Sequence, residues 1–188
     1  MHTLRLFAEG PLVRALEATV VVALVWVIIT LVRARHASVH AALDKSVPEA
    51  LGVAALVTIL VFAAAPNPGV QTTVNLVPLV GLVGGLTSGI DQEIALVLLV
   101  GNLVLFIPIG AVIVWRFRTS ILVAVVIGVL LSIAMETLQF ILNNGGSVDV
   151  DDVIVNGLGA LIGAAAVRLV LRALIWLRTV RAVQNSAT

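Results

Sequence analysis

Residues 136–156 read ETLQFILNNGGSVDVDDVIVN, and they join two long apolar runs of the chain. Gly145 and Gly146 predict a tight turn here, because glycine adopts backbone conformations that other residues avoid. Carboxylates and amides lie on both sides of the turn, which is unusual in a chain this apolar. The stretch therefore predicts two antiparallel helices whose polar side chains lie at one common end.

The composition is that of a membrane protein. Hydrophobic residues make up 61% of the 188 residues and charged residues only 11%, whereas a soluble domain has about 25% charged residues. The formal net charge is +1 and the sequence predicts no basic patch, which argues against nucleic acid as a partner. The chain has no cysteine, so disulfides, thiol catalysis and thiolate metal sites are excluded.

Five apolar segments are long enough to span a bilayer, which requires about 20 mostly apolar residues. We therefore predict an all-α fold, a polytopic transmembrane bundle of about five helices. The predicted helices cover residues 12–32, 47–65, 94–115, 121–142 and 152–176.

These helices divide the chain into three parts. Residues 1–45 contain an amphipathic interfacial segment (residues 1–8), the first helix and a loop. Residues 46–178 are expected to form a transmembrane domain of four helices, and residues 179–188 a flexible tail.

The second predicted helix has signals at both ends. Ser46 and Glu49 have the spacing of a capping box, and Pro48 is tolerated in a first helical turn. Residues 66–69 read PNPG, which cannot continue a helix. We therefore expect a helix confined to residues 47–65.

Positive charges alternate between the predicted loops. The loops at residues 66–93 and 143–151 have none. Because short positively charged loops stay in the cytoplasm, we predict a multi-pass protein of the cell membrane with its C-terminus cytoplasmic and its N-terminus outside. Arg5 and Arg14 oppose this orientation, and nine charges support it: Arg33, Arg35, Lys45, Arg116, Arg118, Arg168, Arg172, Arg178 and Arg181.

Polar and small residues recur on one face of each of the last two predicted helices, at spacings of three and four residues. The sets are Ser132, Glu136, Gln139 and Asn143, and then Asp152, Asn156, Gly159 and Gly163. We predict that these two faces pack together near the outer leaflet.

Four residues are assigned to helix packing. Gly159 and Gly163 form a G-x-x-x-G pair, which lets another helix approach closely. Pro108 removes a backbone hydrogen-bond donor from the third helix, and Gly110 follows it. Asn102, on the same helix, lies toward the predicted outer side.

Glu136 is the only ionisable residue well inside the predicted hydrocarbon zone. Such residues usually face a bundle interior or a watery cavity, which favours a ligand-binding or proton-handling carboxylate. The structural alternative is a packing hydrogen bond to Gln139, Asn102 or Asn156.

The remaining polar residues also have two interpretations. Asp149, Asp151 and Asp152 precede the fifth helix, where they either cap it or hold a hard cation. The spacing of an EF-hand is absent, and we predict no metal. Asn75 begins either an apolar segment that dips into the interface or a turn in which its side chain bonds its own backbone.

Four segments resemble the VanZ-like family in their order and spacing. They are NLVPL (75–79), GNLVLFIPIG (101–110), ETLQF (136–140) and DVDDVIVNGLGALIG (149–163), and the resemblance covers about residues 50–167. It implies an envelope-linked bacterial membrane protein, in a family named for a protein associated with resistance to the glycopeptide teicoplanin. The resemblance does not supply a reaction.

The chain departs from the family pattern at one position. The family usually has an Arg three residues before the first Asp of the last motif, where this chain has Gly146. That Arg is the natural counter-ion for Glu136 or for the aspartates. In the predicted orientation Arg5 or Arg14 lies on the same side, so we hypothesise that one of them replaces it.

The expected function is binding or modulation of an envelope amphiphile at the outer leaflet, linked to teicoplanin resistance. The expected partners are membrane lipids, a lipid-linked envelope precursor or a lipoglycopeptide, without a cofactor. The alternative is an enzyme acting on such a lipid through Glu136 with Asp149 or Asp152, and a transporter or channel subunit ranks third. The ligand-binding candidates are Asn75, Asn102, Glu136, Gln139, Asp149, Asp152 and Asn156.

Overall fold

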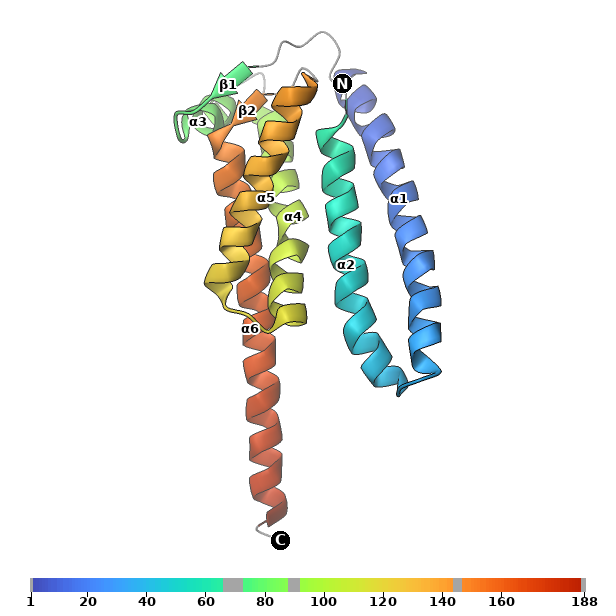
Figure 1. Cartoon of the computed structure of the whole chain (residues 1–188). Coiled ribbons are helices and arrows are strands. Elements are labelled where there is room, and N and C mark those ends of the chain that lie inside the picture. Colours follow the sequence, from blue (N-terminus) through green and yellow to red (C-terminus); the bar gives the residue numbers. More distant parts are fainter. Residues whose placement is uncertain (1, 66–72, 88–91, 144–146, 187–188) are drawn as a thin grey trace.

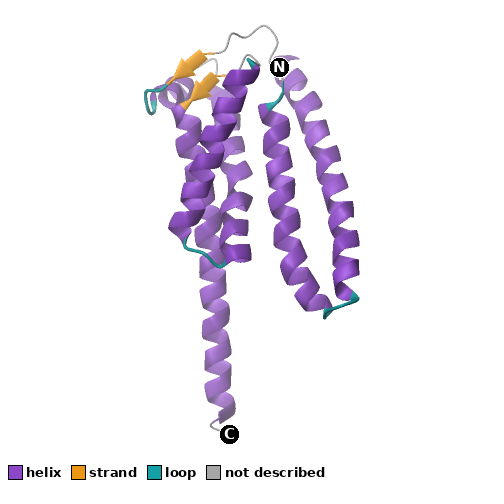
Figure 2. Cartoon of the chain, in the orientation of Figure 1, coloured by secondary structure: helices purple, strands orange, loops and turns teal. Residues whose placement is uncertain are grey.

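The protein is an all-α bundle with a small two-stranded sheet at one end (Figures 1 and 2). The computed structural model describes residues 2–65, 73–87, 92–143 and 147–186. Its elements are α1 (His2–Ala34), α2 (Val39–Ala63), β1 (Thr73–Asn75), α3 (Val80–Thr87), α4 (Gln92–Phe117), α5 (Ile121–Leu142), β2 (Ser147–Asp149) and α6 (Val150–Ser186).

Five of the described helices are long and apolar enough to cross a membrane, which confirms the predicted fold class. The candidate spans are Val13–Ala34, Val39–Ala63, Gln92–Phe117, Ile121–Leu142 and Val150–Ala182. Large apolar side chains on their outward faces are exposed, as a surrounding of lipid requires.

The predicted start of the second helix is wrong. α2 begins eight residues earlier, at Val39, and the side chain of Ser38 accepts a hydrogen bond from the N–H of Ala41 as its N-cap. Ser46 is therefore buried inside the helix, and its hydroxyl accepts from the Arg33 guanidinium. Glu49 forms ion pairs with Arg33 at 2.7 Å and Arg116 at 3.1 Å, and it joins α1, α2 and α4.

Both terminal segments are helical. Residues 2–8, which the sequence predicts to be interfacial, belong to the continuous helix α1. Residues 179–186, expected as a flexible tail, continue α6, which extends well beyond the other helices in Figure 1. Residues 187 and 188 lie outside the described part of the chain.

The bundle consists of a helical hairpin beside a group of three helices (Figure 1). α1 packs against α2, and α2 packs against α4. α4, α5 and α6 form the tighter group, in which α4 and α6 have the most extensive contact. This group holds the candidate site residues except Asn75, which belongs to β1, and Asp149, which is the last residue of β2.

Glycines bring the backbones of α4 and α6 together. A Cβ added at Gly110 would meet the carbonyl oxygen of Ala160, and one at Gly163 would meet that of Ile107. A Cβ at Gly159 would likewise meet the carbonyl oxygen of Leu103. The small residues therefore set the distance between α4 and α6, so Gly159 and Gly163 approach α4 rather than α5.

The sheet and α3 form a cap over one end of the three-helix group (Figure 2). β1 and β2 run parallel, with Thr73 opposite Ser147 and Asn75 opposite Asp149. Their pairing brings the segment before α4 against the segment before α6. Strands of three residues carry too little periodicity to be predicted from sequence.

Candidate functional site

The candidate site is a group of four acidic side chains, which we call the carboxylate cluster, at the capped end of the bundle. Asp149 ends β2, Asp151 and Asp152 lie in the first turn of α6, and Glu136 lies near the end of α5. Their hydrogen bonds differ, although the three aspartates look alike in the sequence. The hydrogen bonds show which carboxylates stabilise the fold and which have an oxygen available to bind a ligand.

Asp151 holds the cap on the bundle. Its side chain is 5% exposed, and its carboxylate accepts hydrogen bonds from the backbone N–H of Leu79 at 2.5 Å and of Leu82 at 2.9 Å. Leu79 has a left-handed backbone conformation with φ of 67°, which costs energy for a residue with a Cβ. Sequence reasoning left Asp151 out of the ligand candidates, and its contacts are those of a structural anchor.

Asp149 joins the two strands and caps α6. Its carboxylate accepts from the Asn75 amide, with N–O distances of 3.1 and 3.2 Å. It also accepts from the N–H of Asp151 at 2.9 Å, which is the bond of a helix N-cap. The Asn75 side-chain oxygen in turn accepts from the N–H of Val77, so Asn75 does form a turn with its own backbone.

Asp152 links α6 to α4. Its Oδ1 accepts from the Asn102 amide at 2.6 Å, and Asn102 is half-buried. No other described residue donates a hydrogen bond to the Asp152 carboxylate. One of its two oxygens is therefore free to accept from another donor.

Glu136 lies beside the aspartates, but its hydrogen bond is not one of those predicted. Its Oε2 accepts from the backbone N–H of Asp149 at 3.1 Å, rather than from Gln139, Asn102 or Asn156. The residue is 8% exposed, and its Oε1 receives no hydrogen bond from the described part of the chain. Glu136 thus binds β2 through Oε2, and its Oε1 remains available to accept a hydrogen bond from a ligand.

The two remaining amide candidates form no hydrogen bond with the carboxylate cluster in the described part of the chain. Asn156 donates to the Ser132 hydroxyl at 2.8 Å and so joins the polar faces of α5 and α6. Asn156 is 5% exposed, and its Oδ1 is buried without a partner among the described residues. Gln139 is half-buried on α5 and takes part in no hydrogen bond assigned in the described chain.

An apolar groove opens beside Glu136 and Asp149. Its volume is about 470 Å³, and its walls come from β1, α5, β2 and the first turn of α6. Several wall residues are themselves exposed to the surroundings, including Leu76 at 71% and Phe140 at 55%. The groove therefore combines exposed apolar walls with two carboxylates.

Among the side chains that the structure describes, no counter-ion for the carboxylate cluster is found, and the side chain of Arg5 lies outside that set. Gly146, which stands where the family usually has Arg, lies outside the described residues. Arg14 is on α1, which packs against α2, and it forms no ion pair with a described acidic residue. Within the described ranges, no group of three or more His, Cys, Asp or Glu residues is arranged to hold a metal.

Sequence comparison gives the family. The family model described as VanZ/LLP1 matches residues 19–172, which is most of the chain. The chain belongs to the VanZ family. Comparison with curated proteins and with solved structures found no significant match.

The VanZ match extends further toward the N-terminus than the four motif segments. It begins within α1 and ends within α6, so it includes all five candidate spans in whole or in part. The four motifs, widely separated in sequence, meet through the contacts of Asn75, Asn102, Glu136 and the three aspartates. The cluster is thus built from residues inside the VanZ region.

Proposed function

We propose that the carboxylate cluster and the adjoining groove bind an amphiphile of the cell envelope. The observation that carries this proposal is the placement of Glu136 and Asp149 in the wall of an otherwise apolar groove. Apolar walls suit an acyl chain, and ionised carboxylates act only as hydrogen-bond acceptors. The proposed ligand has a hydrocarbon chain next to a head group that donates hydrogen bonds.

The charge of the site narrows the class of head group. Four carboxylates meet without a described cation beside them. An anionic phosphate placed there would be repelled, whereas amines, amides and sugar hydroxyls are donors that suit the free oxygens of Glu136 and Asp152. An acylated glycopeptide such as teicoplanin has this combination of groups, which supports the role implied by the family resemblance.

Expression in a susceptible Gram-positive host would test the proposal. We expect the chain to lower susceptibility to teicoplanin more than to vancomycin, which lacks the acyl chain. Glu136→Gln should reduce this effect, because an amide retains one acceptor for the Asp149 N–H but replaces the free carboxylate oxygen with a donor. Glu93→Gln is the matched control. Glu93 is an exposed acid in the first turn of α4, and it does not line the groove.

A second pair of variants tests the groove itself. Ile133→Trp would fill the groove from α5, whereas Ile141→Trp places the same side chain at a site on α5 that is 71% exposed and outside the groove. Binding of teicoplanin to the purified chain in detergent should weaken for Ile133→Trp alone. If all variants at equal membrane levels behave as the wild type in both assays, the proposal fails.

Catalysis on a bound amphiphile is the second candidate. It is favoured by the free Oε1 of Glu136 at the groove, which could accept a proton from a bound hydroxyl or amine. Incubation of the purified chain with a radiolabelled envelope lipid, followed by chromatography, would separate this from binding alone. A product that depends on Glu136 would establish a reaction, and recovery of unchanged lipid with retained binding would favour the binding role.

A further inference from the structure

A second groove lies at the opposite end of the bundle, where α6 passes the ends of α2 and α4. Its volume is about 730 Å³, and it is lined by Asp44, Trp115, Arg118 and a long stretch of α6. The α6 residues include Arg168, Arg172 and Arg178 together with apolar side chains such as Leu174 and Ile175. We call this the basic groove.

The charge of the basic groove is largely uncompensated. Its single acid, Asp44, accepts a hydrogen bond from the Trp115 indole at 3.3 Å and lies 4.0 Å from the Arg118 guanidinium. The three α6 arginines that line the groove form no ion pair with any described residue, and no acidic residue follows Asp152 in the sequence. By contrast, Arg33 and Arg116 at the same end share Glu49.

The apolar part of the groove continues along the same face. Ile175 is 65% exposed, Val170 is 58% exposed, and both lie in the candidate span Val150–Ala182. Guanidinium groups bind phosphate oxygens in a planar, often bidentate arrangement. A ligand with an anionic phosphate next to hydrocarbon chains fits both features of the groove.

We infer that the basic groove binds an anionic phospholipid, with its phosphate held by Arg168, Arg172 and Arg178 and its acyl chains along α6. Basic sites between transmembrane helices bind acidic lipid head groups through this combination of contacts. The carboxylate cluster has the opposite charge and lies at the other end of the bundle. The inference therefore holds whether or not the proposed function is correct.

Trp115 supplies a reporter inside the groove. The chain has two other tryptophans, and we expect replacement of each by phenylalanine to disturb the structure little. Trp26→Phe removes a buried indole N–H that has no partner in the described chain, and Trp176→Phe alters a side chain that is 63% exposed. The double variant leaves Trp115 as the sole tryptophan, so its fluorescence reports on lipid at the basic groove.

The experiment reconstitutes this full-length variant into vesicles that contain chain-brominated phosphatidylglycerol or chain-brominated phosphatidylcholine, because bromine quenches tryptophan on contact. We expect quenching at a lower mole fraction of the anionic lipid, with a preference that weakens as salt rises. Equal quenching by the two lipids would overturn the inference. This comparison needs no substitution of the arginines in the groove.

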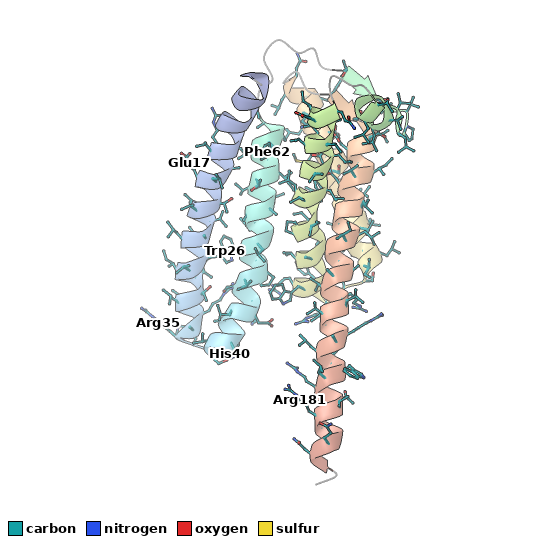
Figure 3. The ribbon with its side chains drawn as sticks, turned by 180° about the vertical axis from the view of Figure 1, so that it is seen from behind. Glu17, Trp26, Arg35, His40, Phe62 and Arg181 are labelled. Carbon is teal, nitrogen blue, oxygen red and sulfur yellow. The ribbon has the colours of Figure 1, made fainter. Side chains whose placement is uncertain are left out.

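Two arginine pairs then localise the effect. Arg168→Gln with Arg172→Gln should lower the preference roughly 30-fold, because each basic side chain near an anionic lipid contributes about fivefold. Arg35→Gln with Arg181→Gln removes the same charge at the same end but outside the groove, and should leave the preference unchanged (Figure 3). Equal losses for both pairs would show general attraction to the membrane and refute the site.

Inorganic phosphate added to the vesicles separates a lipid head group from a free anion. We expect no relief of quenching, because free phosphate brings no hydrocarbon to the apolar face of α6. The control is chloride at the same ionic strength. If phosphate abolished the quenching and chloride did not, the arginines would bind a soluble phosphate instead, which would contradict the inference.

Discussion

The carboxylate of Asp151 accepts a hydrogen bond from the backbone N–H of Leu79, a residue 72 positions earlier in the chain. Through this bond and a second one from Leu82, the first turn of α6 holds both the segment between β1 and α3 and the start of α3. The Asp151 carboxylate is buried, so an acceptor lost there is not readily replaced by water. It fixes the cap beside which Glu136, Asp149 and the groove are arranged.

Asp151→Asn should therefore lower the stability of the whole protein. An amide offers only one oxygen acceptor, so the N–H of Leu79 or of Leu82 loses its partner, at a cost of about 1–3 kcal/mol. Thermal unfolding followed by circular dichroism in detergent would measure the loss. Glu93→Gln removes an exposed acid at the same end and should leave the melting temperature unchanged; equal melting of the two variants would exclude an anchoring role for Asp151.

Gly110→Ala should separate α4 from α6. The added Cβ would meet the Ala160 carbonyl oxygen, which is backbone and cannot rotate away. Overpacking of this kind costs about 1–3 kcal/mol. Gly101→Ala on the same helix meets nothing within 4 Å and should be neutral or stabilising by up to about 1 kcal/mol. The contact would be refuted if both variants unfolded at the wild-type temperature.

The hydrogen bond between Asn156 and Ser132 should couple α5 to α6. Interhelical hydrogen bonds in membranes contribute about 0.5–2 kcal/mol. We expect Ser132→Ala and Asn156→Ala to destabilise the protein individually, and the double variant to lose less than the sum of the two. A double-mutant cycle of unfolding free energies measures the coupling. Additive losses would mean that the two side chains do not interact.

The orientation predicted from the positive charges can be tested by labelling, because the chain has no cysteine of its own. Thr73→Cys places a thiol on the exposed strand β1, and Thr119→Cys places one between α4 and α5. A membrane-impermeant maleimide should label intact cells only for Thr73→Cys, and Thr119→Cys only after permeabilisation. The reverse pattern would place the carboxylate cluster on the cytoplasmic side.

Only part of the candidate site could be predicted from the sequence. Glu136 was recognisable because a lone carboxylate in an apolar helix is costly, and the turn of Asn75 followed a local preference. The functions of the three aspartates could not be separated, because each depends on what lies opposite: Leu79 for Asp151, Asn75 for Asp149 and Asn102 for Asp152. The apolar groove beside Glu136 and the basic groove likewise arise from segments far apart in sequence.

The sequence by itself determined the five long helices, because a run of about 20 apolar residues forces the backbone to satisfy its hydrogen bonds within the segment. The tertiary structure decided the pairing of β1 with β2, the approach of α4 to Gly159 and Gly163, and the partners of each carboxylate. Helix formation depends on neighbours along the chain. Hydrogen bonds between distant segments depend on which surfaces pack together, and that is settled only when the whole bundle assembles.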